Sequence, residues 1–233
     1  MNKDTYSILF EDGTTRGYGS YEEIKLIDGN FVSIKNLINR RGSYVQIEEP
    51  IEAKEEILSI RPIVLGIYLS LGKIMSFTVV SIYSTNLKLR DILDEHIAKS
   101  DKISKVKKKS NSMIISSKIK RNKCKLALNL LDFGEVKRIP QEYLCGSIKQ
   151  RTDLLEGLMY GSMCFENIDL CSDIENLARG LGVFTTVERK RDVKIYKGKK
   201  YRGEISYKIN LNFDKKTNKI IKITKILNGE NNE

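Results

Sequence analysis

Two apolar helical segments, about ninety residues apart, each carry a glycine near their centre. The first reads Ser59-Ile-Arg-Pro-Ile-Val-Leu-Gly-Ile-Tyr-Leu-Ser-Leu-Gly-Lys73 and the second reads Gln150-Arg-Thr-Asp-Leu-Leu-Glu-Gly-Leu-Met159. A glycine inside a helix costs about 1 kcal/mol relative to alanine, so a matched pair, Gly66 and Gly157, needs a structural reason. We therefore expect two helices whose backbones touch at these glycines, within a chain that has an internal two-fold character.

Similar successions of elements follow the two segments. The elements predicted after the first are a strand-rich run over Phe77–Tyr83, a helix over Leu87–Ile97, a strand over Ser112–Ser117 and a helix over Lys125–Leu131. After the second come Met163–Leu170, a helix over Asp173–Leu181 and further strands. The pattern predicts an α+β chain with two αββαββα halves, 58–138 and 139–212.

The segment that joins the two halves carries the most specific resemblance. Ile139-Pro-Gln-Glu-Tyr-Leu144, followed by Gln150 to Met159, closely resembles the linker and second motif of LAGLIDADG homing endonucleases found inside inteins. The resemblance covers roughly residues 43–212. It implies a pseudo-symmetric pair of repeats that holds DNA, and a metal-dependent cleavage centre where the two motif helices end.

That cleavage centre is where the chain departs from the family. The resemblance implies an acidic residue followed by glycine at the end of each motif helix, but Leu71 and Ser162 stand at the acid positions and Met163 replaces the second glycine. Magnesium requires hard oxygen ligands, usually carboxylates, which leucine and serine do not supply. We therefore expect no catalytic residues, no metal, no cofactor and no enzymatic activity.

Basic residues are concentrated beside predicted strands. The chain has a formal net charge of +11, and Lys102–Lys109 and Lys118–Lys125 flank the strand over Ser112–Ser117, while Glu188–Lys194 holds a similar place in the second half. An AT-rich genome that favours lysine codons is the alternative explanation. If the charge serves binding, the candidate DNA-binding residues are Lys105, Lys107, Lys109, Lys118, Lys120, Arg121, Arg189, Lys190 and Arg191. Strand alternation predicts that Lys105, Lys107 and Lys109 share one face and that Lys108 points to the other.

The chain ends differ from the two central halves. Thr5–Thr14 alternates apolar and polar residues into an Asp-Gly turn, which predicts a hairpin, and Asn218–Leu227 predicts a strand. These pieces resemble the intein splicing domain, but Ser20-Tyr-Glu-Glu23 lacks the expected histidine, and Met1 and Glu233 are not splicing nucleophiles. We expect residues 1–57 and 213–233 to form a small β-rich module.

Other classes of protein fit the sequence poorly. The longest apolar run, Ile63–Leu69, is too short to span a membrane, and the four cysteines lack zinc-ligand spacing, which together favour a cytoplasmic protein with reduced thiols. The favoured function is a catalytically inactive, intein-endonuclease-derived protein that binds double-stranded DNA. The alternatives are a maturase-like RNA-binding protein, a non-catalytic interaction subunit of a larger assembly, and a protein with residual nuclease activity.

Overall fold

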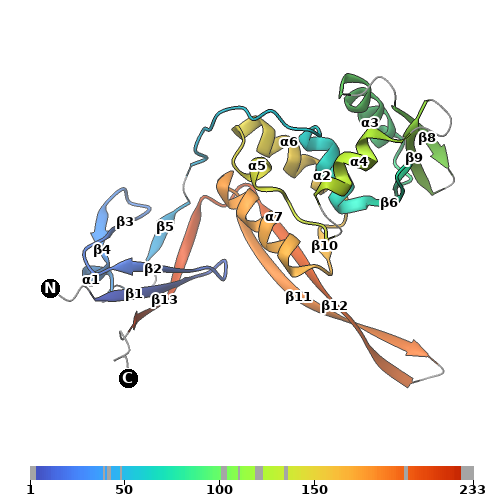
Figure 1. Cartoon of the computed structure of the whole chain (residues 1–233). Helices are drawn as coiled ribbons and strands as arrows, with labels where there is room; N and C mark the ends of the chain where they lie inside the picture. Colours follow the sequence, from blue (N-terminus) through green and yellow to red (C-terminus); the bar gives the residue numbers. More distant parts are fainter. Residues whose placement is uncertain are drawn as a thin grey trace, which may run out of the picture. The chain divides into compact units, whose positions relative to one another are not determined.

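The chain is an α+β protein whose computed structural model divides into two compact units (Figure 1). The structure describes residues 4–38, 40, 43–47, 49–100, 104–109, 111–118, 123–133, 136–196 and 199–226. Unit 1 comprises Met1–Glu49, Gly182–Val187 and Asn210–Glu233, and unit 2 comprises Pro50–Leu181 and Glu188–Ile209. Within the described part, no helix is long and apolar enough to cross a membrane.

The two ends of the chain meet in one sheet of unit 1. Its strands are β1 (Thr5–Phe10), β2 (Thr15–Gly19), β5 (Tyr44–Gln46) and β13 (Thr217–Ile226), in the antiparallel order β2-β1-β13-β5. The hairpin predicted around the Asp-Gly turn is confirmed. Asp12 Oδ1 accepts a hydrogen bond from Thr14 N at 2.8 Å, and Gly13 has φ +83°, a conformation that glycine adopts at little cost.

Smaller elements close the core of unit 1. They are β3 (Glu23–Lys25), β4 (Phe31–Ser33) and the short helix α1 (Ile34–Leu37). Ile8, Ile34 and Leu37 are fully buried in one cluster with Ile220 from the C-terminal strand. Ile220 therefore joins a core otherwise drawn from the first fifth of the chain. Residues 182–187 and 210–212 also belong to this unit, beyond the 1–57 and 213–233 expected from the sequence.

The first half of unit 2 follows the order αββαββα. Its elements are α2 (Pro62–Leu71), β6 (Gly72–Ser76), β7 (Val79–Ile82), α3 (Leu87–Ser100), β8 (Ser104–Lys109), β9 (Ser112–Ser117) and α4 (Lys125–Asp132). The four strands form an antiparallel sheet in the order β6-β7-β9-β8. The sequence prediction lacked β6, which begins at the residue after α2 ends, so no turn signal separates helix from strand.

The second half does not repeat that order, and the two equal αββαββα halves expected from the sequence are not confirmed. Its elements are α5 (Gln141–Leu144), α6 (Ile148–Met159), β10 (Cys164–Phe165), α7 (Ile168–Gly180), β11 (Phe184–Tyr196) and β12 (Lys199–Asn212). Only the two-residue β10 lies between α6 and α7, and in the described residues no helix follows β12. α7 begins at Ile168 rather than Asp173, because the Asn167 side chain caps it by accepting hydrogen bonds from Asp169 N and Leu170 N.

Candidate nucleic-acid interface

Helices α2 and α6 pack backbone against backbone. A Cβ atom added to Gly66 would collide with the carbonyl oxygen of Leu154 and lie 2.8 Å from Leu158 N. A Cβ added to Gly157 would collide with the carbonyl oxygen of Ile63 and lie 3.0 Å from Gly66 Cα. The two glycines thus face each other at the crossing, where the sequence placed them, because any side chain there would force the helices apart.

The same packing brings the C-terminal ends of the two helices together. A Cβ at Gly161 would lie 2.7 Å from Ser70 Cβ, so Leu71 and Ser162, one residue further along each segment, flank this meeting point. Leu71 is half-buried and its carbonyl accepts a hydrogen bond from Tyr83 N at 2.9 Å, whereas Ser162 is exposed. In the described residues, no group of three or more His, Cys, Asp or Glu side chains could hold a metal ion.

The second helix end keeps a glycine-like backbone without a glycine. Met163 has φ +51°, and it is the one described non-glycine residue in the left-handed region. This conformation costs roughly 1–2 kcal/mol for a residue with a Cβ atom. The Met163 carbonyl accepts a hydrogen bond from Ile209 N at 2.9 Å, so pairing with the β12 strand helps to hold the strained residue. Gly72, the counterpart after α2, has an ordinary φ of −94°.

Lys137 places a positive charge at the end of α2. Its Nζ donates to the carbonyl oxygens of Tyr68 at 3.1 Å, Leu69 at 3.0 Å and Gly72 at 2.7 Å, and it lies 4.9 Å from the centre of the Tyr68 ring. A cation suits this position because the last carbonyls of a helix carry partial negative charge. Burial lowers the pKa of Lys137 to about 8.

The linker before α6 holds the helices in place. Arg138 makes a two-pronged ion pair with Asp173 on α7, with its Nε 2.7 Å from Oδ2 and its Nη2 2.8 Å from Oδ1. Asp173 Oδ2 also accepts from Ile139 N at 3.0 Å. The buried Tyr143 hydroxyl donates to the Ile60 carbonyl at 2.9 Å and accepts from Ile60 N at 3.1 Å. These bonds tie the linker to α7 and to the chain just before α2.

Gln150 and Arg151 anchor the extended strap that precedes α2. Gln150 completes a capping box with Ser147, and its side chain also exchanges hydrogen bonds with the backbone of Glu56, at 3.0 Å from Glu56 N and 2.7 Å to Glu56 O. Arg151 is buried and donates to the carbonyls of Ile51, Gly146 and Gly180. Gln150 and Arg151 therefore serve packing and hydrogen bonding within the fold.

The four-stranded sheet of unit 2 has one buried and one open face. Val80 and Ile115 are fully buried on the first face, where the neighbouring helices α2, α3 and α4 contact the sheet. On the open face, Lys73 lies opposite Ser81, Ser81 opposite Ile114, and Ile114 opposite Lys107, although Ser81 in the middle of this row is itself buried. Both Lys73 and Lys107 are exposed.

The lysines of β8 alternate as predicted. Lys105, Lys107 and Lys109 lie opposite Ser116, Ile114 and Ser112, so they share the open face. Lys108 lies opposite the buried Met113 and belongs to the other face. None of the five lysines in these strands forms an ion pair with another described residue, and the four strands contain no Asp or Glu.

The remaining basic candidates are less uniform. Lys118 directly follows β9, and Lys120 and Arg121 lie outside the described residues. On β11, Arg189 and Arg191 share a face, whereas Lys190 falls on the opposite face with Glu188, whose Oε2 is 3.9 Å from Lys190 Nζ. Lys190 is thus placed apart from the two arginines with which it was grouped, and its charge is partly balanced.

Two positively charged side chains, Lys73 and Lys137, were not predicted as site residues from the sequence. Lys73 was not included because β6 was not recognised, although the alternation Gly72-Lys-Ile-Met-Ser76 would have placed it opposite β7. Lys137 gives no local signal at all, because its three carbonyl partners lie more than sixty residues earlier in the chain. Only the folded end of α2 shows its role.

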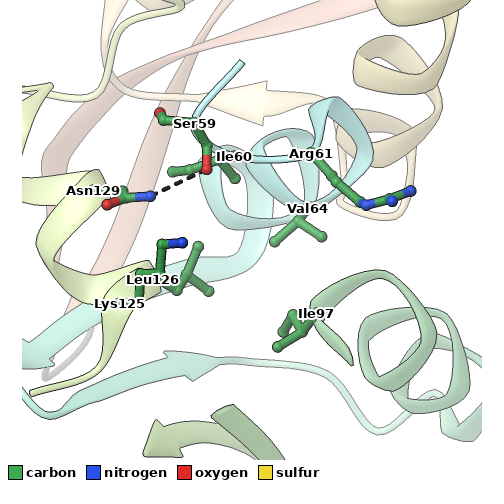
Figure 2. A pocket seen from close by; sticks show the side chains of 8 residues that line it. All are labelled: Ser59, Ile60, Arg61, Val64, Ile97, Lys125, Leu126 and Asn129. Carbon is green, nitrogen blue, oxygen red and sulfur yellow. Dashed lines mark hydrogen bonds between the residues drawn. The ribbon is translucent and has the colours of Figure 1, made fainter. Parts of the chain in front are cut away.

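A small hollow lies at the opposite, N-terminal end of α2. Figure 2 shows Ser59, Ile60, Val64, Ile97 and Leu126 around it, with Asn129 Nδ2 donating to the Ser59 carbonyl at 3.1 Å. The basic side chains at its rim do not converge, because Arg61 points away from Asn129 (Figure 2). This hollow is a small packing defect between α2, α3 and α4 and offers no concentrated charge.

No protein-family model matches the chain, and no curated protein matches it closely enough to count as a relative.

Proposed function

We propose that the chain is a nucleic-acid-binding protein without nuclease activity, built on a LAGLIDADG-type scaffold of intein origin, which binds double-stranded DNA. The observation that carries the proposal is the open face of the β6-β7-β9-β8 sheet. Lys73, Lys105, Lys107 and Lys109 share this face, and the four strands contain no acidic residue. A surface of one sign attracts a polyanion and releases its counterions on binding.

The size of this face suits a duplex groove. Three strand spacings separate β6 from β8, which gives a width of roughly 14 Å. The major groove of DNA is about 12 Å wide and accepts β-structure, so the lysines of β8 can reach the phosphates of one backbone while the sheet extends across the groove toward β6. The sheet therefore has both the charge and the span for a duplex.

The helices and the linker, rather than the strands, support the LAGLIDADG-type scaffold. The Gly66–Gly157 crossing, the Arg138–Asp173 pair and the Gln150–Arg151 anchors all involve residues of the motif helices and the linker that resemble intein endonucleases. The incomplete second half, with its single short strand between α6 and α7, is the main departure from that family. It favours a protein that has kept one intact DNA-binding repeat.

The loss of cleavage follows from the helix ends. Leu71 and Ser162 supply no carboxylate, and the Lys137 ammonium bonded to three carbonyls adds a positive charge where a metal-binding site would need negative charge. We expect no magnesium-dependent cleavage of plasmid or linear duplex. Specific double-strand breaks by the purified protein would overturn this part of the proposal.

The decisive experiment uses two neighbouring lysines on opposite faces. Fluorescence anisotropy with a 30-base-pair duplex, measured between about 50 and 200 mM salt, should show that Lys107→Ala weakens binding and reduces the slope of log K against log salt by about one unit. Lys108→Ala removes the same charge from the same strand but from the other face, and should leave the slope unchanged.

The triple variant of Lys105, Lys107 and Lys109 to Ala should flatten the slope further, by close to one unit for each of these lysines that neutralises a phosphate. Equal effects of Lys107→Ala and Lys108→Ala would show that DNA does not bind the open face in preference to the other face, contrary to the proposal. Binding of an RNA duplex in preference to DNA would favour the RNA-binding alternative, and no binding of either polymer would favour an interaction subunit.

A further inference from the structure

The edge of the open face at β8 is rich in lysine, whereas the edge at β6 and β7 carries exposed apolar side chains. Met75, Phe77 and Tyr83 all belong to the β6–β7 hairpin or its immediate end, and they are 56, 61 and 52% exposed. The hydroxyl of Tyr83 lies 3.9 Å from Met75 Sδ, so at least these two side chains form one patch. We call Met75, Phe77 and Tyr83 the apolar edge.

Strand geometry aims the apolar edge toward the open face. Tyr83 follows Ile82, whose side chain is buried, so alternation directs Tyr83 to the opposite face, the one that carries Lys73. The pairing of β6 with β7 shifts between Ile74 and Ser76, which leaves Met75 as the extra residue of a bulge. Bulges change the direction of a side chain, and here the result is a contact with Tyr83.

The turn at the tip of the hairpin is held in place although its aromatic side chain is not. The Phe77 carbonyl accepts from Cys124 N at 2.9 Å, and the hydroxyls of Ser76 and Thr78 are 2.8 Å apart. Thr78 N also donates to Ser76 Oγ at 3.2 Å. An exposed aromatic ring on a fixed backbone loses little conformational entropy when it binds, which is typical of side chains that contact a partner.

The position of the β8 lysines indicates which part of a nucleic acid would contact the apolar edge. The cross-strand row that ends at Ser76, beside the turn, begins at Lys105 on β8. A nucleic acid whose backbone lies along β8 would therefore present its bases, and not its phosphates, to the apolar edge. Apolar and aromatic side chains inserted at a base step unstack it, and they bind most easily where a step is already weak.

We infer that the apolar edge is a base-contacting wedge, which makes the protein prefer duplex DNA with an opened step, such as a mismatch or a short bulge, over a perfect duplex. The inference rests on the proposed DNA binding by the lysine face and adds a structural specificity to it. The lysines supply contacts that every duplex satisfies, whereas the wedge supplies contacts that only an opened step can make.

The test compares three DNA probes of equal length: a perfect duplex, the same duplex with a central two-nucleotide bulge, and one with a central mismatch. The parent should bind the bulged probe more tightly than the perfect one by about 5- to 150-fold, the range that one stacked base provides. Phe77→Ala and Met75→Ala should remove most of this preference while changing affinity for the perfect duplex less than about twofold and leaving the salt slope unchanged. 2-Aminopurine beside the bulge should report the contact by a fluorescence change that Phe77→Ala abolishes.

Two controls separate the wedge from general effects. Phe31→Ala removes an aromatic side chain of similar exposure, 63%, from unit 1 and should keep the preference. Phe77→Leu keeps an apolar side chain without a ring and should retain only part of it. Equal affinity of the parent for all three probes would overturn the wedge but leave the lysine face intact. Loss of the preference in Phe31→Ala as well would also overturn it, whereas absence of any DNA binding would overturn the proposed function itself.

Discussion

At the crossing of α2 and α6 two backbones touch through Gly66 and Gly157, whereas on the open face of the neighbouring sheet three of four lysines project into solvent. Around the crossing, the polar linker side chains Arg138, Tyr143, Gln150 and Arg151 are all hydrogen-bonded to described residues. On the open face, the lysines pair with no described carboxylate. The contrast teaches that the polar groups of the first region are satisfied within the fold, whereas the charges of the second are left to solvent, as the proposed DNA binding requires.

The largest effect on this comparison is expected from adding a side chain at the helix crossing. Gly66→Leu should destabilise the protein by at least about 3 kcal/mol, the upper end of overpacking costs, because the new side chain meets the backbone of α6 rather than flexible side chains. Urea unfolding followed by circular dichroism measures the change. Gly17→Leu is the matched control, since a Cβ at exposed Gly17 would meet no atom within 4 Å. Equal losses in both variants would show that the crossing is not special.

A pH series tests the charge at the end of α2. Burial lowers the pKa of Lys137 to about 8, so between about pH 8 and 10.5 the unfolded chain binds more protons at this site than the folded chain. The free energy of unfolding should therefore rise with pH across this window. Lys137→Met should abolish that part of the rise, as measured by urea unfolding at pH 7.5, 9 and 10. The same slope in both proteins would mean that the carbonyl partners keep the ammonium charged as strongly as water does.

Removing the Tyr143 hydroxyl tests the hydrogen bonds that anchor the linker. Tyr143→Phe removes both hydrogen bonds to Ile60, which is 3% exposed, and should cost about 1–3 kcal/mol because the Ile60 amide and carbonyl remain buried without partners. Thermal unfolding reports the loss. Tyr21→Phe, at a tyrosine that is 71% exposed, should change stability by less than about 0.5 kcal/mol. Similar shifts for both tyrosines would contradict the anchoring role.

The smallest expected effect completes the contrast. Replacing Lys105, Lys107 and Lys109 together by Ala should alter the free energy of unfolding by no more than about 0.5 kcal/mol per residue, because exposed side chains without partners contribute little. A slight gain in stability is expected from relief of repulsion between like charges on one strand. A large drop in the free energy of unfolding in urea would place these lysines in the fold rather than at an interface.

The elements that the sequence predicted well are those with a local cause. The Asp12-Gly13 turn and the strand Ser112–Ser117 appear with the predicted bounds, and the glycine pair lies at the crossing. The second half was predicted to copy the first because α6 resembles α2, yet the strand β10 is only two residues long. Its length depends on pairing with β12, more than forty residues later, and no local pattern encodes that pairing.

The candidate site shows the same division. Alternation along Lys105–Lys109 assigned faces correctly, because a strand fixes the direction of each side chain by period two alone. In β11, the same rule separates Lys190 from Arg189 and Arg191, which grouping by composition had overlooked. Lys137 was missed because its significance comes from three carbonyls at the end of a distant helix.

The order in which the chain leaves the ribosome gives the glycine crossing a further consequence. α2 buries residues on every side, including Ile63, Leu65 and Ile67, but Gly157 emerges roughly ninety residues after Gly66. Until then, the side of α2 that packs on α6 has no partner, although β6, β7 and α3 can already contact its other sides. The unit 1 sheet is completed later still, because β1 pairs with β13, which is synthesised about two hundred residues after it. Completion of each unit thus waits for a segment made long after its first elements, and in that interval aggregation and chaperone binding compete with folding.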